Sequence, residues 1–310
     1  MYNQEIKERF LAEYTAGGRN ENTCRSILEL IGIYEEAIQV DIAEMSHNDA
    51  VEAVRGTKTG SYGSAAHVAS LIKSYARWCK DSGALSNVNC ALMSISVDDI
   101  DSSRHLSTLL FKSEDDLISE MRSVRPFDDG YFEVVVLLFA WLGIDTRTSM
   151  SIKIDDVNIE DKFIKIESDG RIVQFSDAVA DVISVYAKTK VGTRAARGET
   201  RQVYRDNSYD RFIRKFCPPK QLGKELTLSQ VRSAISEMNQ IYVEEGNESR
   251  LNTSNVMVSG ALHRVWTLEQ SGLDVFSVKN KSIVAEAFGL DAKPYEVLWL
   301  YKNYKAAFNL

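Results

Sequence analysis

Proline and glycine are scarce in this sequence of 310 residues, with only 4 and 17 copies. Because these residues most often interrupt regular structure, their scarcity predicts long helical segments. Cysteine is also scarce: Cys24, Cys79, Cys90 and Cys217 form no C-x-x-C pair and no framework of the kind that staples short secreted chains. We therefore expect reduced thiols in a cytoplasmic protein.

Long hydrophobic runs are missing as well. The longest apolar run, residues 131–144, contains Glu133 and is too short to cross a bilayer. The first ten residues, MYNQEIKERF, include no hydrophobic signal region. With 44% hydrophobic and 26% charged residues, the chain can still bury a sizeable core, so we expect a soluble intracellular protein of two domains and no membrane partner.

The sequence offers no pattern for a metal or a cofactor. Its four histidines, at 47, 67, 105 and 263, lack metal-ligand spacing. GlyThrLysThrGly at 56–60 lacks the full phosphate-binding loop, and no G-x-S-x-G nucleophile elbow occurs. We expect no metal and no cofactor.

Apolar residues at three- and four-residue spacing predict four helices in the first hundred residues. Two of them lie around Ile6–Leu11 and Ile27–Tyr34, and the others cover 44–54 and 64–80. Residues 94–116 are polar and acidic, which indicates a solvated connection. We place the domain boundary there, with domains at 1–104 and 105–310.

The second domain begins with predicted helices at 114–124 and 130–143, the latter apolar nearly all round and therefore buried. Residues 152–175 then contain three short β-rich stretches separated by AspLys and AspGly turns, which predict a small antiparallel meander. From Ala178 onward the helical pattern returns, and it ends in a helix at about 293–308 that could dock in cis or on a neighbour. The expected fold is mainly α with a small antiparallel sheet.

The net charge of −7 argues against an acidic partner, but the charge is segregated along the chain. Residues 188–224 hold 11 Lys and Arg against 3 acids, a net +8, and residues 54–80 hold five cations and no acid. The remaining residues carry −20. Two basic segments in an acidic protein favour phosphate binding over the alternative of two solvated faces.

The candidate DNA-contacting residues come from these segments and from the positions discussed below. Lys73, Arg77 and Lys80 share one predicted helix face. The full set is Arg55, Lys58, Lys73, Arg77, Lys80, Arg147, Arg171, Lys188, Lys190, Arg194, Arg197, Arg201, Arg205, Arg211, Arg214, Lys215, Ser229 and Arg232.

A four-helix domain followed by a helical domain with a small sheet resembles the tyrosine recombinase (phage integrase) family over most of its length. SerLeuIleLysSerTyrAlaArgTrpCysLysAspSerGly at 70–83 resembles a helix of that family's core-binding domain. ValLeuLeuPheAlaTrpLeuGlyIleAspThrArgThr at 136–148 resembles the helix and turn that deliver the first catalytic arginine. The resemblance implies a two-domain clamp on DNA.

The family's chemistry uses a tyrosine nucleophile, two arginines, a histidine-type donor and a lysine. Asp145 stands where the resemblance places the first arginine, with Arg147 two residues on, and Asp169 stands near the lysine position, with Arg171 after it. The His-x-x-Arg motif reads Ser229 to Arg232, so only its arginine matches.

The last two catalytic positions fall near Gly260–Ala261 and Gln270, although His263 or Trp266 could be shifted into either role. Tyr295, Tyr301 and Tyr304 lie in the terminal helix, where we expect them to pack. We therefore expect no catalytic set. Arg232 would bind phosphate beside Ser229, or else pair with Glu237 or another acid within its helix.

Within this family the chain is similar to the MrpR group, the master repressors of lysogeny in SPbeta-type Bacillus phages. This resemblance implies a sequence-specific repressor that binds repeated phage operator elements on double-stranded DNA in the host cytoplasm. Protein regulators of lysis and lysogeny and self-association on DNA are further expectations.

Two other classes of function stay open. One is an active recombinase with a rearranged site, which requires a covalent tyrosine adduct with DNA. The other is a non-catalytic interaction module whose basic segments contact acidic proteins or RNA.

Overall fold

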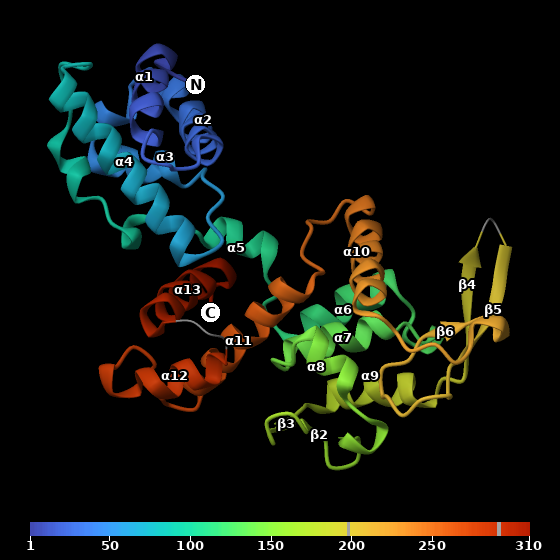
Figure 1. Cartoon of the computed structure of the whole chain (residues 1–310). Coiled ribbons are helices and arrows are strands. Elements are labelled where there is room, and N and C mark those ends of the chain that lie inside the picture. The colour runs from blue at the N-terminus through green and yellow to red at the C-terminus, as the bar shows by residue number, and fades with distance from the viewer. Residues whose placement is uncertain (197–198, 290–292) are drawn as a thin grey trace. The chain divides into compact units, whose positions relative to one another are not determined.

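The structure, a computed structural model, describes residues 1–196, 199–289 and 293–310. It divides into two compact units: unit 1 holds Met1–Ser107 and Tyr295–Leu310, and unit 2 holds Thr108–Pro294. The final segment thus groups with unit 1, whereas the sequence-based division placed it in the second domain. The chain is mainly helical with small antiparallel sheets, which confirms the expected fold class (Figure 1). No helix in the described ranges is both long and apolar enough to span a membrane.

Unit 1 is helical, and its elements include the four helices that the sequence predicts. Its α-helices and 3-10 helices are α1 (Gln4–Thr15), α2 (Glu21–Ile38), η1 (Ile42–Glu44), α3 (His47–Val54), α4 (Tyr62–Ser82), η2 (Cys90–Ser94), η3 (Val97–Asp99), α5 (Ser103–Leu109) and α13 (Pro294–Phe308), the last two running across the division between the units.

Side-chain caps define where the main helices of unit 1 begin. Asn20 accepts from the backbone N–H of Thr23 at the start of α2, and Ser61 and Ser64 form a reciprocal capping box at the start of α4. Gly83, at φ 66°, ends α4 in the left-handed conformation that glycine adopts without strain. Local sequence signals therefore account for the start of α2 and for both ends of α4.

The expectation of a solvated connection at 94–116 is wrong. This stretch contains η3, α5 and the start of α6 (Glu114–Val124), and Ile95, Ile100 and Leu106 are buried. Its acids cap turns: Asp99 accepts from the backbone N–H of Ser96, and Asp101 accepts from that of Ser103. In the sequence, the many polar residues of this stretch obscured the pattern of the buried apolar residues between them.

Helix α13 docks in cis on unit 1. Trp299 is 5% exposed within the unit 1 core, and its Nε1 donates to the carbonyl of Val97 over 3.1 Å. Asn303 accepts from the backbone N–H of Ser102 over 2.9 Å. Tyr301 and Tyr304 are fully buried, as expected, while Tyr295 is 46% exposed.

Unit 2 is built around the buried helix α7 (Phe132–Trp141), which the sequence predicted, and other helices surround it (Figure 1). Its remaining elements are α6, η4 (Phe127–Asp129), α8 (Thr146–Ser151), η5 (Ile154–Asp156), β1 (Val157–Asn158), β2 (Phe163–Lys165), β3 (Ile172–Gln174), α9 (Asp177–Lys188), β4 (Val191–Ala196), β5 (Glu199–Arg205), β6 (Phe216–Cys217), η6 (Pro219–Gln221), α10 (Leu228–Glu244), α11 (Thr253–Gln270), η7 (Val278–Asn280) and α12 (Lys281–Phe288).

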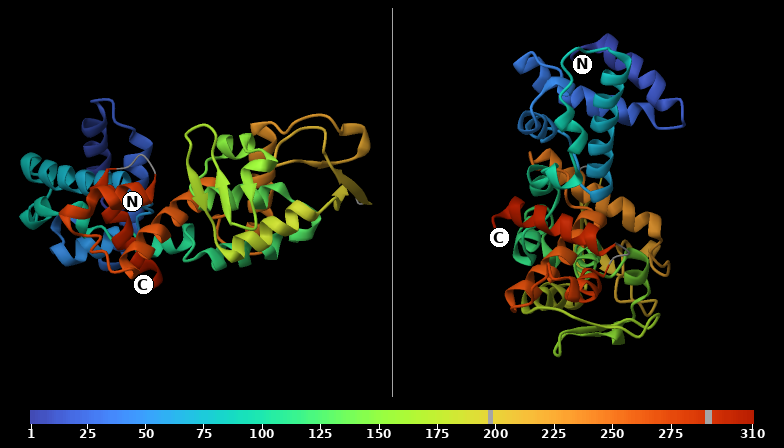
Figure 2. Two further views of the ribbon diagram at one scale, coloured as in Figure 1. Left: turned by 90° about the horizontal axis from the view of Figure 1, so that it is seen from below. Right: turned by 90° about the vertical axis from the view of Figure 1, so that its left-hand side faces the viewer.

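The predicted meander is confirmed, but the sequence missed a second sheet. Strands β1, β2 and β3 pair in that order, all antiparallel. Strands β4, β5 and β6 form another antiparallel sheet in a stretch that was expected to be helical, and the two sheets lie at separate places on unit 2 (Figure 2). Arginine, threonine and glutamine in β4 and β5 conceal the period-two alternation that identifies a strand.

Helix α11 crosses the end of α7 at very short range. A Cβ added to Gly260 would collide with the main-chain carbonyl of Trp141. Arg264, one turn further along α11, donates from Nη1 to the same carbonyl over 2.9 Å. Only glycine at position 260 permits this approach.

We predict that Gly260→Ala lowers the free energy of unfolding by about 1–3 kcal/mol, because the new methyl group must displace backbone. Gly63→Ala in α4 is the matched control: a Cβ there meets nothing nearer than 3.9 Å. The control should stabilise the protein by about 0.5 kcal/mol. Urea denaturation measures both changes, and equal effects would contradict the close crossing.

Candidate nucleic-acid interface

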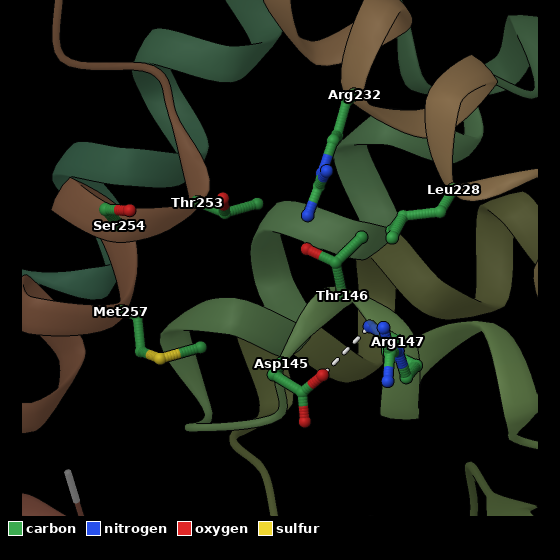
Figure 3. Close-up of a pocket in the computed structure, with 8 residues that line it drawn as sticks. All are labelled: Asp145, Thr146, Arg147, Leu228, Arg232, Thr253, Ser254 and Met257. Carbon is green, nitrogen blue, oxygen red and sulfur yellow. Dashed lines mark hydrogen bonds between the residues drawn. The ribbon is translucent and has the colours of Figure 1, made fainter. Parts of the chain in front are cut away.

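Three helices of unit 2 begin at one hollow of 270 Å³. The lining comes from the start of α8 and its N-cap, from the first turns of α10, and from the first turns of α11 (Figure 3). The residues are Asp145, Thr146, Arg147, Leu228, Arg232, Thr253, Ser254 and Met257. Helix N-termini carry partial positive charge, so the starts of the long helices α10 and α11 favour an anion here.

Arg232 is one of two exposed cations that line this hollow, the other being Arg147. Arg232 reaches from α10 toward Thr146, with Thr253 across the hollow (Figure 3). The alternative of a helix ion pair with Glu237 is wrong, because that carboxylate lies 3.2 Å from Arg125. Within the described ranges no acid lies at salt-bridge distance from Arg232, so its guanidinium is available to a ligand.

Asp145 acts as the N-cap of α8. Its carboxylate accepts from the backbone N–H groups of Arg147 and Thr148 at 2.9 and 3.1 Å, and from the Thr148 hydroxyl at 2.5 Å. Partial burial acts to raise the pKa of Asp145, but the hydrogen bonds from Thr148 and Arg147 outweigh it and hold the pKa below its ordinary value. The hollow therefore contains a fixed negative charge beside its two arginines.

A second hollow of 210 Å³ adjoins the first through Arg147, which lines both. Its lining is Arg147, Met150, Ser151, Tyr209, Arg211, Ile213, Glu225 and Leu226. We call the two hollows together the arginine groove, because Arg232, Arg147 and Arg211 follow one another along it. Asp145 and Glu225 are its acids. Arg211 already makes one hydrogen bond within the protein, since its Nη1 donates to the carbonyl of Ser151 over 2.9 Å.

The structure does not bring every predicted site residue to this groove. Ser229 is exposed but does not line the hollow, where Leu228 takes the place beside Arg232. Arg171 lies at the exposed tip between β2 and β3 and pairs with Asp169 over 2.6 Å. Gly260 packs against α7 and Gln270 ends α11, so neither lines the hollow.

Besides Arg211, other arginines of the basic segment 188–224 have internal partners. Arg194 donates to the carbonyls of Asp129 and Gly130 and stacks over the Tyr131 ring at 3.7 Å. Arg205 donates to carbonyls of the helix α9, and burial lowers its pKa. They anchor the β4–β5 hairpin to the body of unit 2.

Arg214 completes this internal set, since it is 7% exposed and donates to the carbonyl of Arg211 over 2.6 Å. Arg211 and Lys215 are half-buried, and Lys188, Lys190 and Arg201 are exposed. Arg197 lies outside the described residues.

The cations of the basic segment 54–80 in unit 1 also differ from one another in their surroundings. Arg55 pairs with Glu52 and lies 3.5 Å from Asp101, while Lys58 is exposed without an ion pair in the described part of the chain. Lys73 is half-buried, and Arg77 and Lys80 are exposed on α4. The Lys80 ammonium lies 3.4 Å from the sulfur of Cys90.

The sequence did not predict the residues by which α11 lines the first hollow: Thr253, Ser254 and Met257. The available signal was Asn252, a helix N-cap residue placed just before the apolar pattern of α11. That signal locates the start of α11, but only the fold shows that this start faces Arg232. In the part of the chain that the structure describes, no tyrosine, histidine or lysine lines this first hollow.

Comparison with known proteins finds one family model that resembles the N-terminal residues. Residues 1–81 match the family described as MrpR, N-terminal core-binding domain. This part of unit 1 is therefore similar to a core-binding domain of the MrpR type.

The solved structures that resemble most of the chain include a recombinase and a transposon integrase. The XerA recombinase is 14% identical, covers 99% of this chain and 96% of its own, and has a TM-score of 0.42. The Tn1549 transposon integrase, solved with a circular intermediate DNA, is 13% identical over 96% of this chain and 94% of its own, with a TM-score of 0.39. With TM-scores below 0.5, neither likeness bears on function. No curated protein matches the sequence.

Proposed function

We propose that this protein binds duplex DNA sequence-specifically, holds it without cutting it, and acts as a phage transcriptional repressor that maintains lysogeny. The observation that carries the proposal is the arginine groove, in which Arg232, Arg147 and Arg211 follow one another beside the N-termini of α10 and α11. The likeness of residues 1–81 to the MrpR core-binding domain supports DNA as the ligand, because the resemblance to tyrosine recombinases implies that the bound core is DNA.

Guanidinium groups suit this role because they form paired, charge-assisted hydrogen bonds with phosphate oxygens. The α10 and α11 N-termini add attraction for an anion that does not depend on side-chain identity. On this proposal the groove holds the DNA backbone in the cytoplasm of the host. Repeated operator elements, protein regulators and self-association on DNA belong to the same proposal.

The proposal of binding without cleavage is supported by the side chains of the first hollow. Bond breaking would require a nucleophile and a proton donor for the leaving oxygen next to the bound phosphate. Around Arg232 stand Thr146, Thr253 and Ser254, whose neutral hydroxyls can donate hydrogen bonds to phosphate. Asp145 adds a negative charge that opposes the binding of a reactive phosphate.

We expect Arg232→Gln, and equally Arg147→Gln, to weaken binding to every duplex and to reduce the slope of log K against log salt by about 0.9. Fluorescence anisotropy with a labelled phage-genome duplex at several salt concentrations measures both. Arg122→Gln, an exposed helix arginine outside the groove, is the matched control. Wild-type protein that binds no duplex at low salt would refute the proposed function.

We expect Asp145→Asn to tighten binding. Asparagine caps a helix as well as aspartate does, so α8 should keep its start while the groove loses a negative charge. A charge pair about 4 Å apart in water is worth roughly 1 kcal/mol, so the gain at low salt should be about fivefold. Unchanged or weaker binding by a variant with unchanged unfolding would contradict phosphate binding beside Asp145.

A rearranged active site is the second candidate, and Tyr209 is the observation in its favour. This tyrosine lines the second hollow with Arg147 and Arg211, and its hydroxyl accepts from the backbone N–H of Lys215 over 3.4 Å. Burial raises its pKa, which disfavours the nucleophilic phenolate.

A nicked suicide substrate decides between the two candidates, because a recombinase traps itself covalently on such DNA. We expect no SDS-resistant adduct with wild-type protein at a concentration that saturates the duplex. An adduct that disappears in Tyr209→Phe would refute non-cleaving binding and identify the nucleophile.

A further inference from the structure

One wall of the arginine groove is an irregular stretch of chain between β5 and β6. Residues 206–215 contain neither helix nor strand, and they supply Tyr209, Arg211 and Ile213 to the second hollow. Because no regular element fixes this stretch, the positions of these side chains depend on the contacts that hold it. We call residues 206–215 the groove loop.

Arg214 is the buried centre of the groove loop. Its side chain is 7% exposed, and its Nε donates to the Arg211 carbonyl over 2.6 Å. Its Nη1 donates to the side-chain oxygen of Asn207. Both acceptors belong to the loop itself, so one guanidinium ties three of its residues together.

Tyr186 fastens the groove loop to α9. Its hydroxyl donates to the Arg214 carbonyl and accepts from the Arg214 backbone N–H, each over 2.9 Å. Burial raises the pKa of Tyr186 to about 12, so the hydroxyl keeps its proton at neutral pH. The backbone N–H of Phe212 adds a bond to the Ile152 carbonyl over 2.9 Å. A shift of the loop would leave these buried groups unpaired, which is costly.

The bonds of Arg214 go to neutral oxygens. Among the residues that the structure describes, no acid lies at salt-bridge distance from its guanidinium. A planar guanidinium binds two acceptors at a fixed angle, which the flexible ammonium of a lysine does not do. The geometry of the loop therefore depends on arginine at this position, and not on a positive charge alone.

Arg211 is held at two points and open at a third. Arg214 binds its carbonyl, and its own Nη1 donates to the Ser151 carbonyl over 2.9 Å. Its Nε and Nη2 make no hydrogen bond within the described ranges. Two such donors on one guanidinium match two oxygens of a phosphate. The side chain lines both the second hollow and an adjoining one of 370 Å³, so a ligand can reach it.

We propose that Arg214 is a positioning residue of the arginine groove: it fixes Arg211, whose Nε and Nη2 bind a backbone phosphate of the DNA. Tyr186 acts one step further back by holding Arg214. This inference rests on the proposed function and deepens it. The charge pattern of the sequence predicts Arg214 as a DNA contact, whereas the geometry gives it an indirect role.

A double-mutant comparison in the full chain tests the proposal. Affinity for a labelled phage-genome duplex is measured by fluorescence anisotropy for Arg211→Gln, for Arg214→Gln and for the two changes together. We expect each single change to weaken binding about fivefold and to lower the salt slope by about 0.9. The double variant should bind as Arg211→Gln does, because Arg214 acts only through Arg211. Independent effects, about 25-fold together, would overturn the proposal.

Two further variants separate position from charge and from folding. Arg214→Lys keeps the charge but not the planar fork, so it should weaken binding as Arg214→Gln does. Wild-type affinity in Arg214→Lys would overturn the positioning role. Tyr186→Phe keeps the buried ring and removes only the hydroxyl, and its effect should also vanish in the Arg211→Gln background. This variant provides the same comparison if Arg214→Gln does not fold.

The matched controls are Arg250→Gln and Tyr242→Phe, the same changes at a second arginine–tyrosine contact of unit 2. There the Nε of Arg250 donates to the Tyr242 hydroxyl over 3.2 Å, and neither residue lines the arginine groove. Both controls should bind DNA as wild type does. An equal loss of binding in the folded controls would show general loosening and overturn the proposal.

The outcomes also separate this inference from the proposed function. Wild-type affinity in Arg211→Gln, with weakened binding in Arg232→Gln, overturns the role of Arg214 while DNA binding stands. Failure of wild-type protein to bind any duplex overturns the proposed function itself.

Discussion

The close crossing of α11 over the end of α7 is the contact on which the arginine groove depends. Gly260 lets the two backbones approach, and Arg264 ties α11 to the Trp141 carbonyl and to the Ala287 and Phe288 carbonyls. Burial lowers the pKa of Arg264 to about 10, so the guanidinium stays charged at neutral pH and its bonds persist. The chain leaves α7 through Asp145 into α8 and enters α11 at Thr253, so one crossing positions two walls of the hollow.

The basic segment 188–224 shows why a count of charges does not locate a binding surface. The β4–β5 hairpin has few apolar side chains of its own, so arginines fix it to unit 2 through carbonyls and aromatic rings. Arg194 and Arg201 lie directly opposite each other across the strands, a like-charge pair that costs stability unless another contact offsets it. The Asp129 and Gly130 carbonyls and the Tyr131 ring supply that contact for Arg194.

Much of the fold could be predicted from the sequence, and the failures have one physical origin. Helices α1 to α4, α6 and α7 and the meander follow from apolar periodicity and turn residues, which are local signals. The sequence did not predict the second sheet or the ordered structure at 94–116. In both places polar side chains cap turns or anchor strands. Arg232 and Arg147 could be predicted as site residues, but Thr253 and Met257 join them only through the α7–α11 crossing, which no local pattern encodes.

On the proposed function, helix N-termini explain how a groove can bind phosphate without the catalytic residues of a recombinase. An arginine, lysine or histidine at a catalytic position is lost by one substitution, whereas the N-terminal ends of α10 and α11 persist as long as the helices do. Asp145 illustrates the consequence: its carboxylate accepts from two N–H groups at the start of α8 and stabilises the helix by about 0.5–2 kcal/mol, at the position where the sequence resemblance places the first catalytic arginine. On the proposed function, such a replacement costs some affinity and no activity, because the groove has only to hold DNA.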